Sequence, residues 1–359
     1  MLYCMLGIDA KAAGAAWTVF LVALLVATAY AIRETLAVFI IALLFAYLLI
    51  PLVGFVERIT PRQFSPRIAL AMVYLVLVGA IITLALTLGS RLADEANSLA
   101  TQLPALLKNL SWMQIVPLPT WIEPARANII RTIQGELSTS GQEILPYVMS
   151  FGGHLVSGAK YALYFILIPI LAFFFLKDGA TIRDEFVVGL VEKRRRPVVE
   201  SILEDINLLL GEYIRALVLL SAASFTAHNI FLGFSGAPYA VLLAGVAALG
   251  EFIPVVGPAA AGLIVLLVTS LSGYNHVWLY VIFWLLYRLV QDYFLSPYLM
   301  SKGVRLNPML VLFGVLAGDQ IAGVLGMFLS VPLLAILRVL FVRLRRARAG
   351  HLLTPSAEP

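Results

Sequence analysis

The segment that most constrains this fold is an apolar run over residues 238–270, interrupted near its middle by a carboxylate and two prolines. The interruption extends from Gly250 to Pro258 and reads GEFIPVVGP. Inside a bilayer no water satisfies a broken backbone or a charge, so such a segment must be buried in protein or line a wet cavity. The run therefore predicts a functional hairpin, with a plain loop between two short spans as the alternative.

A second segment repeats this one 68 residues later. Residues 248–253 align with residues 316–321, which places Gly250 on Gly318 and Glu251 on Asp319. Both segments follow a proline, and glycines come soon after each acidic residue. Two apolar segments interrupted by Gly or Pro at matching positions of two halves are the sequence sign of a transporter's binding site.

The composition of the chain is typical of an integral membrane protein that crosses the bilayer several times. Of its 359 residues 61% are hydrophobic and 13% are charged, whereas soluble domains carry about 25% charged residues. The net charge of +5 does not indicate nucleic-acid binding, because the basic residues cluster beside apolar spans as cytoplasmic loops require. Cys4 is the single cysteine, which excludes a disulfide within the chain and a metal site built on cysteines.

Apolar runs of bilayer length and the positive-inside rule predict how the chain is divided. The segment with the Lys193–Arg196 basic run has apolar residues at helical spacing, which suggests a helix on the inner membrane face that could contact acidic lipid. We expect transmembrane helices 1–3 within residues 1–88, an external amphipathic or loop region over 89–154, a fourth transmembrane helix over 155–177, a cytoplasmic amphipathic segment over 178–210, a transport core over 211–342 and a basic cytoplasmic tail over 343–359.

The transport core contains two apolar runs that are each too short for two full crossings. Each run fits a re-entrant hairpin preceded by one span, and the two hairpins would enter from opposite faces as an inverted-topology repeat. The predicted fold is an all-α polytopic membrane protein with about six full transmembrane helices and two re-entrant helical hairpins. Simple hydropathy gives eight spans instead.

The candidate substrate or ion site lies at the two hairpin tips. Glu251 and Asp319 would meet near the midplane, where two carboxylates share a proton or hold a cation and where burial raises a carboxyl pKa. Alternatively, both acids merely cap helical turns. The tip residues expected to take part are Glu251, Asp319, Pro254, Gly257, Gly318 and Gln320.

A second group of charges should lie near the cytoplasmic side. Glu212 and Arg215 begin the expected fifth span, residues 211–234. Arg288 and Asp292 lie towards the end of the expected sixth, residues 274–298, with the i,i+4 spacing of a helical ion pair. A structural ion-pair cluster is one interpretation, and a cytoplasmic gate is the other. His228 could bind a polar solute or simply pack within its helix, and the histidines show no metal-ligand spacing.

No pattern supports an enzyme. The GFSG at residues 233–236 matches the GxSG of intramembrane serine proteases, but no second catalytic motif accompanies it. Walker A, GxGxxG and HExxH motifs do not occur in the sequence. We therefore expect no catalytic activity, no cofactor and no metal.

Seven short motifs occur in order along the chain: FLKD at 175–178, EYIR at 212–215, GAPYA at 236–240, FIPVVGP at 252–258, LNP at 306–308, GVLG at 323–326 and VP at 331–332. In this order they resemble the AI-2E (autoinducer-2 exporter) transporter family. One departure is that Ala216 and Leu217 follow Arg215, where members often have Gly-Gln, so a polar group is missing near the cytoplasmic entrance.

The resemblance implies a secondary transporter of the cell inner membrane with both termini cytoplasmic. The cargo would be a small polar solute, such as an autoinducer-2-like signalling molecule that is exported. A sodium or other cation/proton antiporter is the alternative, and a non-transporting membrane scaffold is the second alternative. The resemblance also implies a homo-oligomer, with a pentamer as one option, and membrane lipid, proton or sodium as partners.

Overall fold

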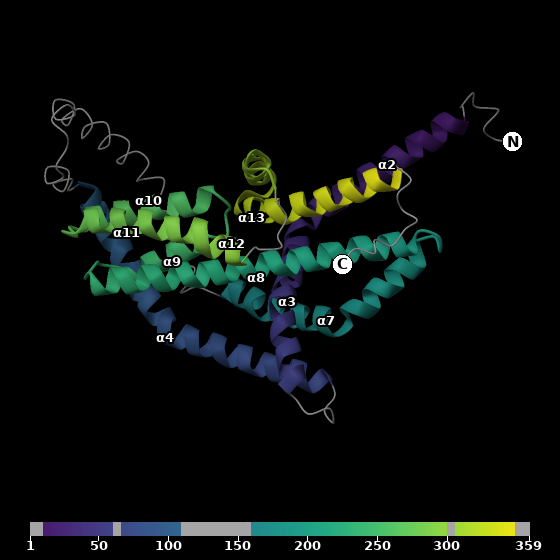
Figure 1. The fold of residues 1–359 in the computed structure, drawn as a ribbon. Coiled ribbons are helices and arrows are strands. Elements are labelled where there is room, and N and C mark those ends of the chain that lie inside the picture. The colour runs from purple at the N-terminus through teal and green to yellow at the C-terminus, as the bar shows by residue number, and fades with distance from the viewer. Residues whose placement is uncertain (1–9, 60–65, 109–158, 300–305, 349–359) are drawn as a thin grey trace.

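The computed structural model describes residues 10–59, 66–108, 159–299 and 306–348, and all regular structure in these ranges is helical. By length and composition alone, five helices there are suited to cross a membrane: α2, α3, α4, α8 and α13. The all-α polytopic class is confirmed (Figure 1). The helices are α2 (Ala10–Ala31), α3 (Arg33–Ile59), α4 (Pro66–Lys108), α7 (Ala159–Leu190), α8 (Arg196–Phe234), α9 (Ala240–Gly250), α10 (Val256–Leu271), α11 (Val277–Val290), the π-helical turn η2 (Gln291–Leu295), α12 (Ser296–Leu299) and α13 (Pro308–Arg348).

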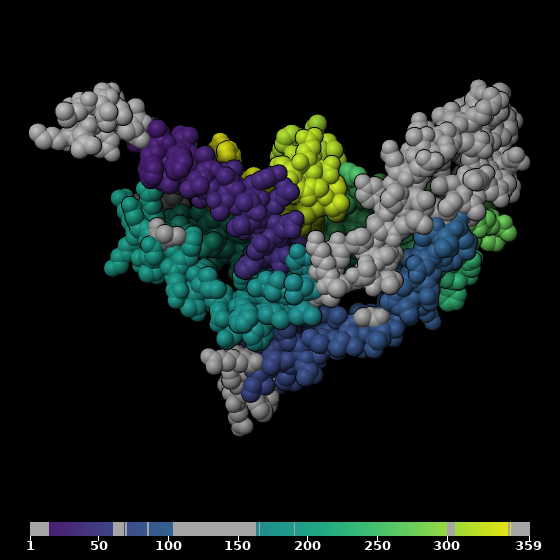
Figure 2. All heavy atoms as spheres, turned by 180° about the vertical axis from the view of Figure 1, so that it is seen from behind, coloured from purple at the N-terminus to yellow at the C-terminus, as the bar shows by residue number. Residues whose placement is uncertain are grey.

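Two helices extend well beyond the spans expected from the sequence. Helix α4 continues for 43 residues to Lys108, so the start of the predicted external region is part of the same helix as the third span. The rest of that region, residues 109–158, lies outside the described residues. Seen from behind, α4 forms one edge of the molecule and reaches the helices of the C-terminal half (Figure 2).

Helix α8 is the element along which the C-terminal half is assembled. Its 39 residues run through Gly211 without a break, a length of about 58 Å at 1.5 Å per residue. Residues 196–210 and the predicted fifth span therefore form one continuous helix. Helices α9, α10 and α11 gather along the C-terminal part of α8, and the second part of α13 follows its N-terminal part, where Arg343 pairs with Asp205 (Figure 1).

The first hairpin is formed by α9 and α10. Gly250 ends α9, and Val255 reverses the chain with a φ of 66°. A Cβ on Gly250 would lie 2.8 Å from the carbonyl oxygen of Gly257, and a Cβ on Gly257 would collide with the carbonyl oxygen of Gly250. Only glycine allows the two backbones to approach this closely.

The second hairpin is formed within α13. The helix breaks at Ala322 and Gly323, where φ is 58° at the glycine. A Cβ on Gly326 would collide with the carbonyl oxygen of Gly318, and Gly314 lies against Leu334 further along the same two legs. The legs are therefore antiparallel and close on each other through glycines, as in the first hairpin.

The two hairpins match at the level of single residues. The positive-φ positions, Val255 and Gly323, are separated by the same 68 residues that separate Gly250 from Gly318. The preceding helices α8 and α11 are antiparallel, because Phe231 stacks on Phe283 while His228, one turn earlier, contacts Tyr287, one turn later. Accordingly, the two units of helix plus hairpin run in opposite directions.

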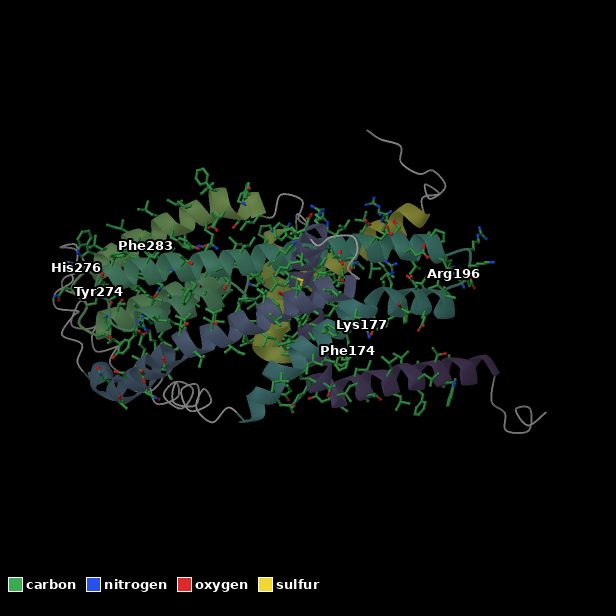
Figure 3. The ribbon with its side chains drawn as sticks, turned by 90° about the horizontal axis from the view of Figure 1, so that it is seen from below. Phe174, Lys177, Arg196, Tyr274, His276 and Phe283 are labelled. Atoms are coloured by element: carbon green, nitrogen blue, oxygen red, sulfur yellow. The ribbon has the colours of Figure 1, made fainter. Side chains whose placement is uncertain are left out.

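The side chains at the starts of α8 and α11 lie at opposite ends of the molecule, as expected for antiparallel helices. Tyr274 and His276, which precede α11, lie at one end, and Arg196, which begins α8, lies at the other (Figure 3). The Arg196 guanidinium donates hydrogen bonds to the carbonyl oxygens of Val188 and Val191, at 2.9 and 3.2 Å, and so closes the turn between α7 and α8.

Candidate functional site

Glu251 lies at the tip of the first hairpin and is buried, with 7% of its surface exposed. Its Oε2 accepts a hydrogen bond of 2.6 Å from Nε2 of Gln291, and its Oε1 lies 3.8 Å from Nη1 of Arg288. The hairpin tip therefore carries its carboxylate to the end of α11. A buried carboxylate needs such partners, because desolvation otherwise disfavours its charge.

Gln291, one partner of Glu251, lies where the helix changes locally from α-helical to π-helical. Helix α11 continues directly into the π-helical turn of Gln291–Leu295, whose wider turn accommodates one extra residue. Arg288 donates to both carboxylate oxygens of Asp292, at 2.9 and 3.2 Å, while Gln291 faces Glu251. Such π-helical turns occur frequently at functional sites, and here the turn carries Gln291 and Asp292 while Arg288 lies in the preceding turn of α11.

A small cavity adjoins Glu251. Its volume is about 10 Å³, which is room for the centre of one water molecule. Two buried polar atoms of its lining residues, Nε2 of His228 and the hydroxyl of Tyr287, have no hydrogen-bond partner in the described residues, and the same is true of Oε1 of Gln291, whose Nε2 bonds to Glu251. The residues that line it are Ser224, His228, Ala247, Glu251, Pro258, Gly262, Trp284, Tyr287 and Arg288.

His228 is fixed within this group by packing and by one hydrogen bond. Its ring lies 5.2 Å from the rings of both Phe283 and Tyr287, measured between centroids, and its Nδ1 lies 2.9 Å from the carbonyl oxygen of Ser224. Because Nδ1 is engaged in this way, Nε2 is the nitrogen left to interact with a bound water or ion.

The other predicted tip residues are placed differently from Glu251. Asp319 and Gln320 are exposed on α13, and no hydrogen bond or ion pair in the described residues joins Asp319 to Glu251. Pro254 is half-buried. Gly257 and Gly318 each form one side of a glycine closure, so their role in the structure is to let the hairpin legs meet.

The four charges predicted near the cytoplasmic side are not gathered into one cluster. Arg288 and Asp292 form the expected i,i+4 ion pair, but Arg288 also faces Glu251. Arg215 donates through Nε to the carbonyl oxygen of Gly211, at 2.9 Å, and within the described residues neither it nor Glu212 pairs with Arg288 or Asp292.

The two hairpins nevertheless approach each other. The rings of Phe252 and Phe328 are 5.7 Å apart between centroids and meet edge to face. Beside them is an open pocket of about 530 Å³ between the first hairpin and the second leg of the other. Its lining is apolar: Val246, Leu249, Gly250, Phe252, Ile253, Gly257, Ala260, Ala261, Ile264, Val324, Leu325 and Phe328.

Sequence reasoning missed Gln291, Ser224 and Tyr287 as neighbours of Glu251. A signal was available for Gln291, which stands beside Asp292 and one turn after Arg288 at the end of an apolar helix. Ser224 and Tyr287 are ordinary residues of apolar helices, and only the packing of α8 against α11 directs them to one cavity.

With the hairpins and the buried acid in place, similarity to known proteins identifies the family. Residues 19–346 match the family described as AI-2E family transporter. The chain belongs to that family. It is therefore a member of a family of membrane transporters and not of enzymes, as the sequence motifs indicated.

Relatives of this AI-2E family chain come from distant organisms. "Putative transport protein YueF" of Bacillus subtilis (strain 168) is 26% identical over 86% of this chain and 85% of that protein. "Putative permease PerM" of Escherichia coli (strain K12) is 25% identical over 84% and 85%, respectively. "Putative transport protein YrrI" of B. subtilis is 28% identical, and that match spans about half of each chain (55% and 56%).

Proposed function

We propose that this AI-2E family member is a secondary transporter in which Glu251 is the coupling group. The observation that carries the proposal is a buried carboxylate at the tip of a hairpin, beside a cavity with unpartnered polar atoms. Ionisable residues inside the membrane region of transporters are costly and mark ion or proton pathways. In transporters built from inverted repeats, substrate and ion sites lie at interrupted helices where the two repeats meet.

The charge balance around Glu251 supports a cationic ligand. Two carboxylates, Glu251 and Asp292, share the single guanidinium of Arg288. Arg288 is closer to Asp292, at 2.9 Å, than to Glu251, at 3.8 Å, although Glu251 is by far the more buried acid. One negative charge is therefore left over in a poorly solvated site, and a proton or a monovalent cation would neutralise it.

The size of the cavity favours cation/proton exchange over binding of an organic solute at Glu251. Room for one water molecule is also room for a dehydrated cation, but not for a sugar-sized molecule. Asp319 occupies the matching position of the second hairpin, and we propose it as the second acid of the cycle. Because it is exposed in this structure, it would act when the hairpins are in another arrangement.

Export of a small solute, such as an autoinducer-2-like molecule, is the second candidate function. The observation that favours it is the pocket of about 530 Å³ between the hairpins, which is within the usual size of small-molecule sites. The pocket has the size for such a solute, while its apolar lining offers a polar molecule few hydrogen-bond partners. In this version Glu251 binds the coupling ion and the solute binds beside it, between Phe252 and Phe328.

The proposal includes a cellular setting that comes from the sequence. In this proposal the Lys193–Arg196 run and the arginines near the end of α13 are cytoplasmic by the positive-inside rule, both termini lie inside the cell, and the membrane is the inner membrane. The homo-oligomer implied by the family resemblance belongs to the same proposal.

Flux measurements in proteoliposomes test this function. Purified protein would be assayed with and without imposed sodium and proton gradients, first for cation/proton exchange and then for solute export. We expect Glu251→Gln and Asp319→Asn to assemble normally and to lose flux or its dependence on pH near neutrality. Asp184→Asn is the matched control, because Asp184 is an exposed acid that pairs with Arg183 on α7.

Normal, pH-dependent flux in the Glu251→Gln and Asp319→Asn double variant would remove both acids from the mechanism. Absence of flux in the wild-type protein under every gradient would support the scaffold alternative instead. Loss of flux in the Asp184→Asn control would show that the assay reports general damage and not the role of the hairpin acids.

A further inference from the structure

The first hairpin begins at a helix end that has no cap of its own. Tyr239 precedes α9 in the left-handed conformation, with a φ of 58°, and makes no side-chain capping bond. The first N–H groups of a helix lack partners within the helix and need an outside acceptor. Here the N–H of Leu242 donates to Oε2 of Glu95, at 2.8 Å, across 147 residues of sequence.

A second bond joins the same two elements. The hydroxyl of Tyr239 donates to Oε1 of Gln102, at 3.0 Å, and Gln102 is held in turn by a bond of 3.1 Å from its Nε2 to the hydroxyl of Ser98. Glu95 and Gln102 are seven residues apart, so they lie on one face of α4, two turns from each other.

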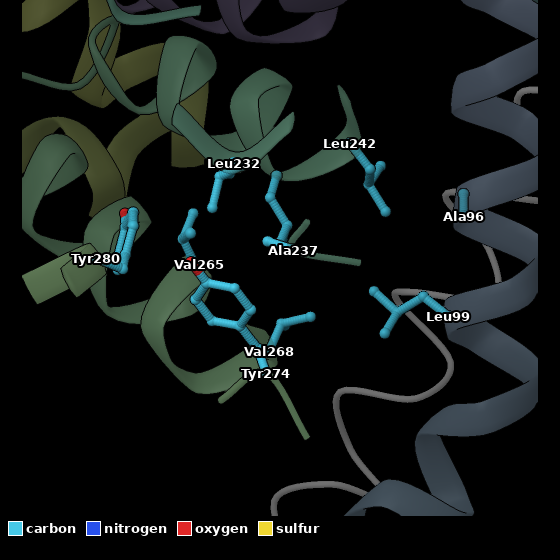
Figure 4. Packing of buried hydrophobic residues seen from close by; sticks show 10 residues of the cluster. Ala96, Leu99, Leu232, Ala237, Leu242, Val265, Val268, Tyr274 and Tyr280 are labelled. Carbon is cyan, nitrogen blue, oxygen red and sulfur yellow. The ribbon is translucent and has the colours of Figure 1, made fainter. Parts of the chain in front are cut away.

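Apolar contacts fill the space between these two polar bonds. Leu99 of α4 is buried in the same cluster as Leu242, Ala237 and Tyr274, and Figure 4 shows it facing the start of the hairpin. Leu92, one turn before Glu95, packs against the same cluster, and a Cβ added to Gly245 would lie 3.9 Å from its Cδ2. One face of α4 is therefore matched to the start of α9 by both shape and hydrogen bonding.

We propose that this face of α4 is a clamp that positions the first hairpin, with Glu95 as its principal positioning residue. Helix α9 has only 11 residues, a length of about 16 Å, and Leu242 is nine residues before Glu251, so the helix acts as a short rod. A shift at Leu242 is passed along this rod to Glu251. The inference rests on the proposed function, because the position of Glu251 matters for transport only if Glu251 is the coupling group.

Two parts of the Glu95 interaction are separable by substitution. The carboxylate accepts the Leu242 N–H, and its charge also favours the positive end of the α9 dipole. Glutamine keeps an acceptor at the same length and loses the charge, whereas alanine loses both. The clamp should accordingly weaken in the order wild type, Glu95→Gln, Glu95→Ala.

Hydrogen–deuterium exchange of the full-length protein in detergent tests the clamp without using flux. We expect amide exchange in peptides covering residues 240–248 to be about fivefold faster in Glu95→Ala, the usual effect of losing a helix N-cap, and intermediate in Glu95→Gln. Asp94→Ala is the matched control. Asp94 is the exposed neighbour of Glu95 and has no hydrogen bond or ion pair in the described residues, so exchange should stay at the wild-type value.

Flux in proteoliposomes is the second readout. A positioning role predicts that Glu95→Ala lowers flux, that Glu95→Gln restores much of it, and that Tyr239→Phe has a smaller effect in the same direction. If Glu95→Ala does not assemble, Glu95→Gln and Tyr239→Phe still carry both measurements, because each is nearly isosteric with the native residue.

The outcomes separate the clamp from the proposed function. Unchanged exchange over 240–248 in the Glu95 variants would overturn the clamp, whatever the flux. Faster exchange with wild-type flux would overturn the positioning role. If Glu251→Gln also leaves flux unchanged, the proposed function is wrong, and Glu251 has no transport role that would require positioning. Faster exchange over 240–248 in the Glu95 variants would then still show that the contact between α4 and α9 forms.

Discussion

The glycine closures of the two hairpins lead to the prediction that can be developed furthest. In Gly257→Ala, the added Cβ would collide with the Gly250 carbonyl oxygen and would lie 2.8 Å from Cβ of Ile253. The colliding oxygen belongs to the backbone, so no side-chain rotation relieves the contact. The hairpin must open, at the typical cost of overpacking, about 1–3 kcal/mol.

In a matched control variant, Gly233→Ala, the expected change in unfolding free energy has the opposite sign. Gly233 is in the last turn of α8, and a Cβ there would meet no atom within 4 Å. Gly233→Ala should therefore stabilise the protein by up to about 1 kcal/mol through the reduced entropy of the unfolded chain. The two alanine variants are thus expected to differ by about 1–4 kcal/mol in unfolding free energy.

Thermal unfolding in detergent, followed by the loss of the monodisperse species, measures this difference. Gly326→Ala repeats the test in the second hairpin, where the added Cβ would collide with the Gly318 carbonyl oxygen. Equal stability of Gly257→Ala and Gly233→Ala would refute the reasoning, because it would mean that the hairpin legs are not in contact. A loss in only one of the two hairpins would refute their equivalence.

Two further predictions concern charge and orientation. Arg288→Ala should lower stability by about 1–3 kcal/mol more than Asp292→Ala, because it leaves Glu251 buried without its cationic partner, and adding Glu251→Gln should recover most of the loss in the same unfolding assay. A cysteine at Asp94 should react with an impermeant thiol reagent added outside the cell and one at Arg195 should not, with the native cysteine replaced; the reverse pattern would contradict the proposed orientation.

Much of the fold was predictable because it depends on local sequence. Apolar runs of bilayer length force the backbone into helices, since no other partner for N–H and C=O groups exists in lipid. The hairpins around Gly250 and Gly318 were also predictable from local sequence. The glycines and the positive-φ turn that close each hairpin lie within about eight residues of each other. The length of the helices was less well predicted, since α4 and α8 continue into polar sequence where helical propensity and packing, not lipid, decide the end.

The partners of the charged residues were decided by tertiary structure. Sequence spacing gave the Arg288–Asp292 pair, because i,i+4 contacts follow from helix geometry alone. It did not give the approach of Arg288 and Gln291 to Glu251, 40 residues before Gln291, because that depends on how far the hairpin inserts and on the extra residue of the π-helical turn.

The same reason applies to the bond between Glu95 and the start of α9. Glu95 lies in α4, and the N–H of Leu242 lies in α9, 147 residues later. Neither segment has a sequence pattern that indicates contact with the other. The sequence determined that there would be helices, a membrane and two hairpins, because those follow from hydrophobic length and backbone hydrogen bonding. Only the packing of whole helices determined which buried carboxylate meets which donor, because the rotation and depth of each helix depend on all its neighbours at once.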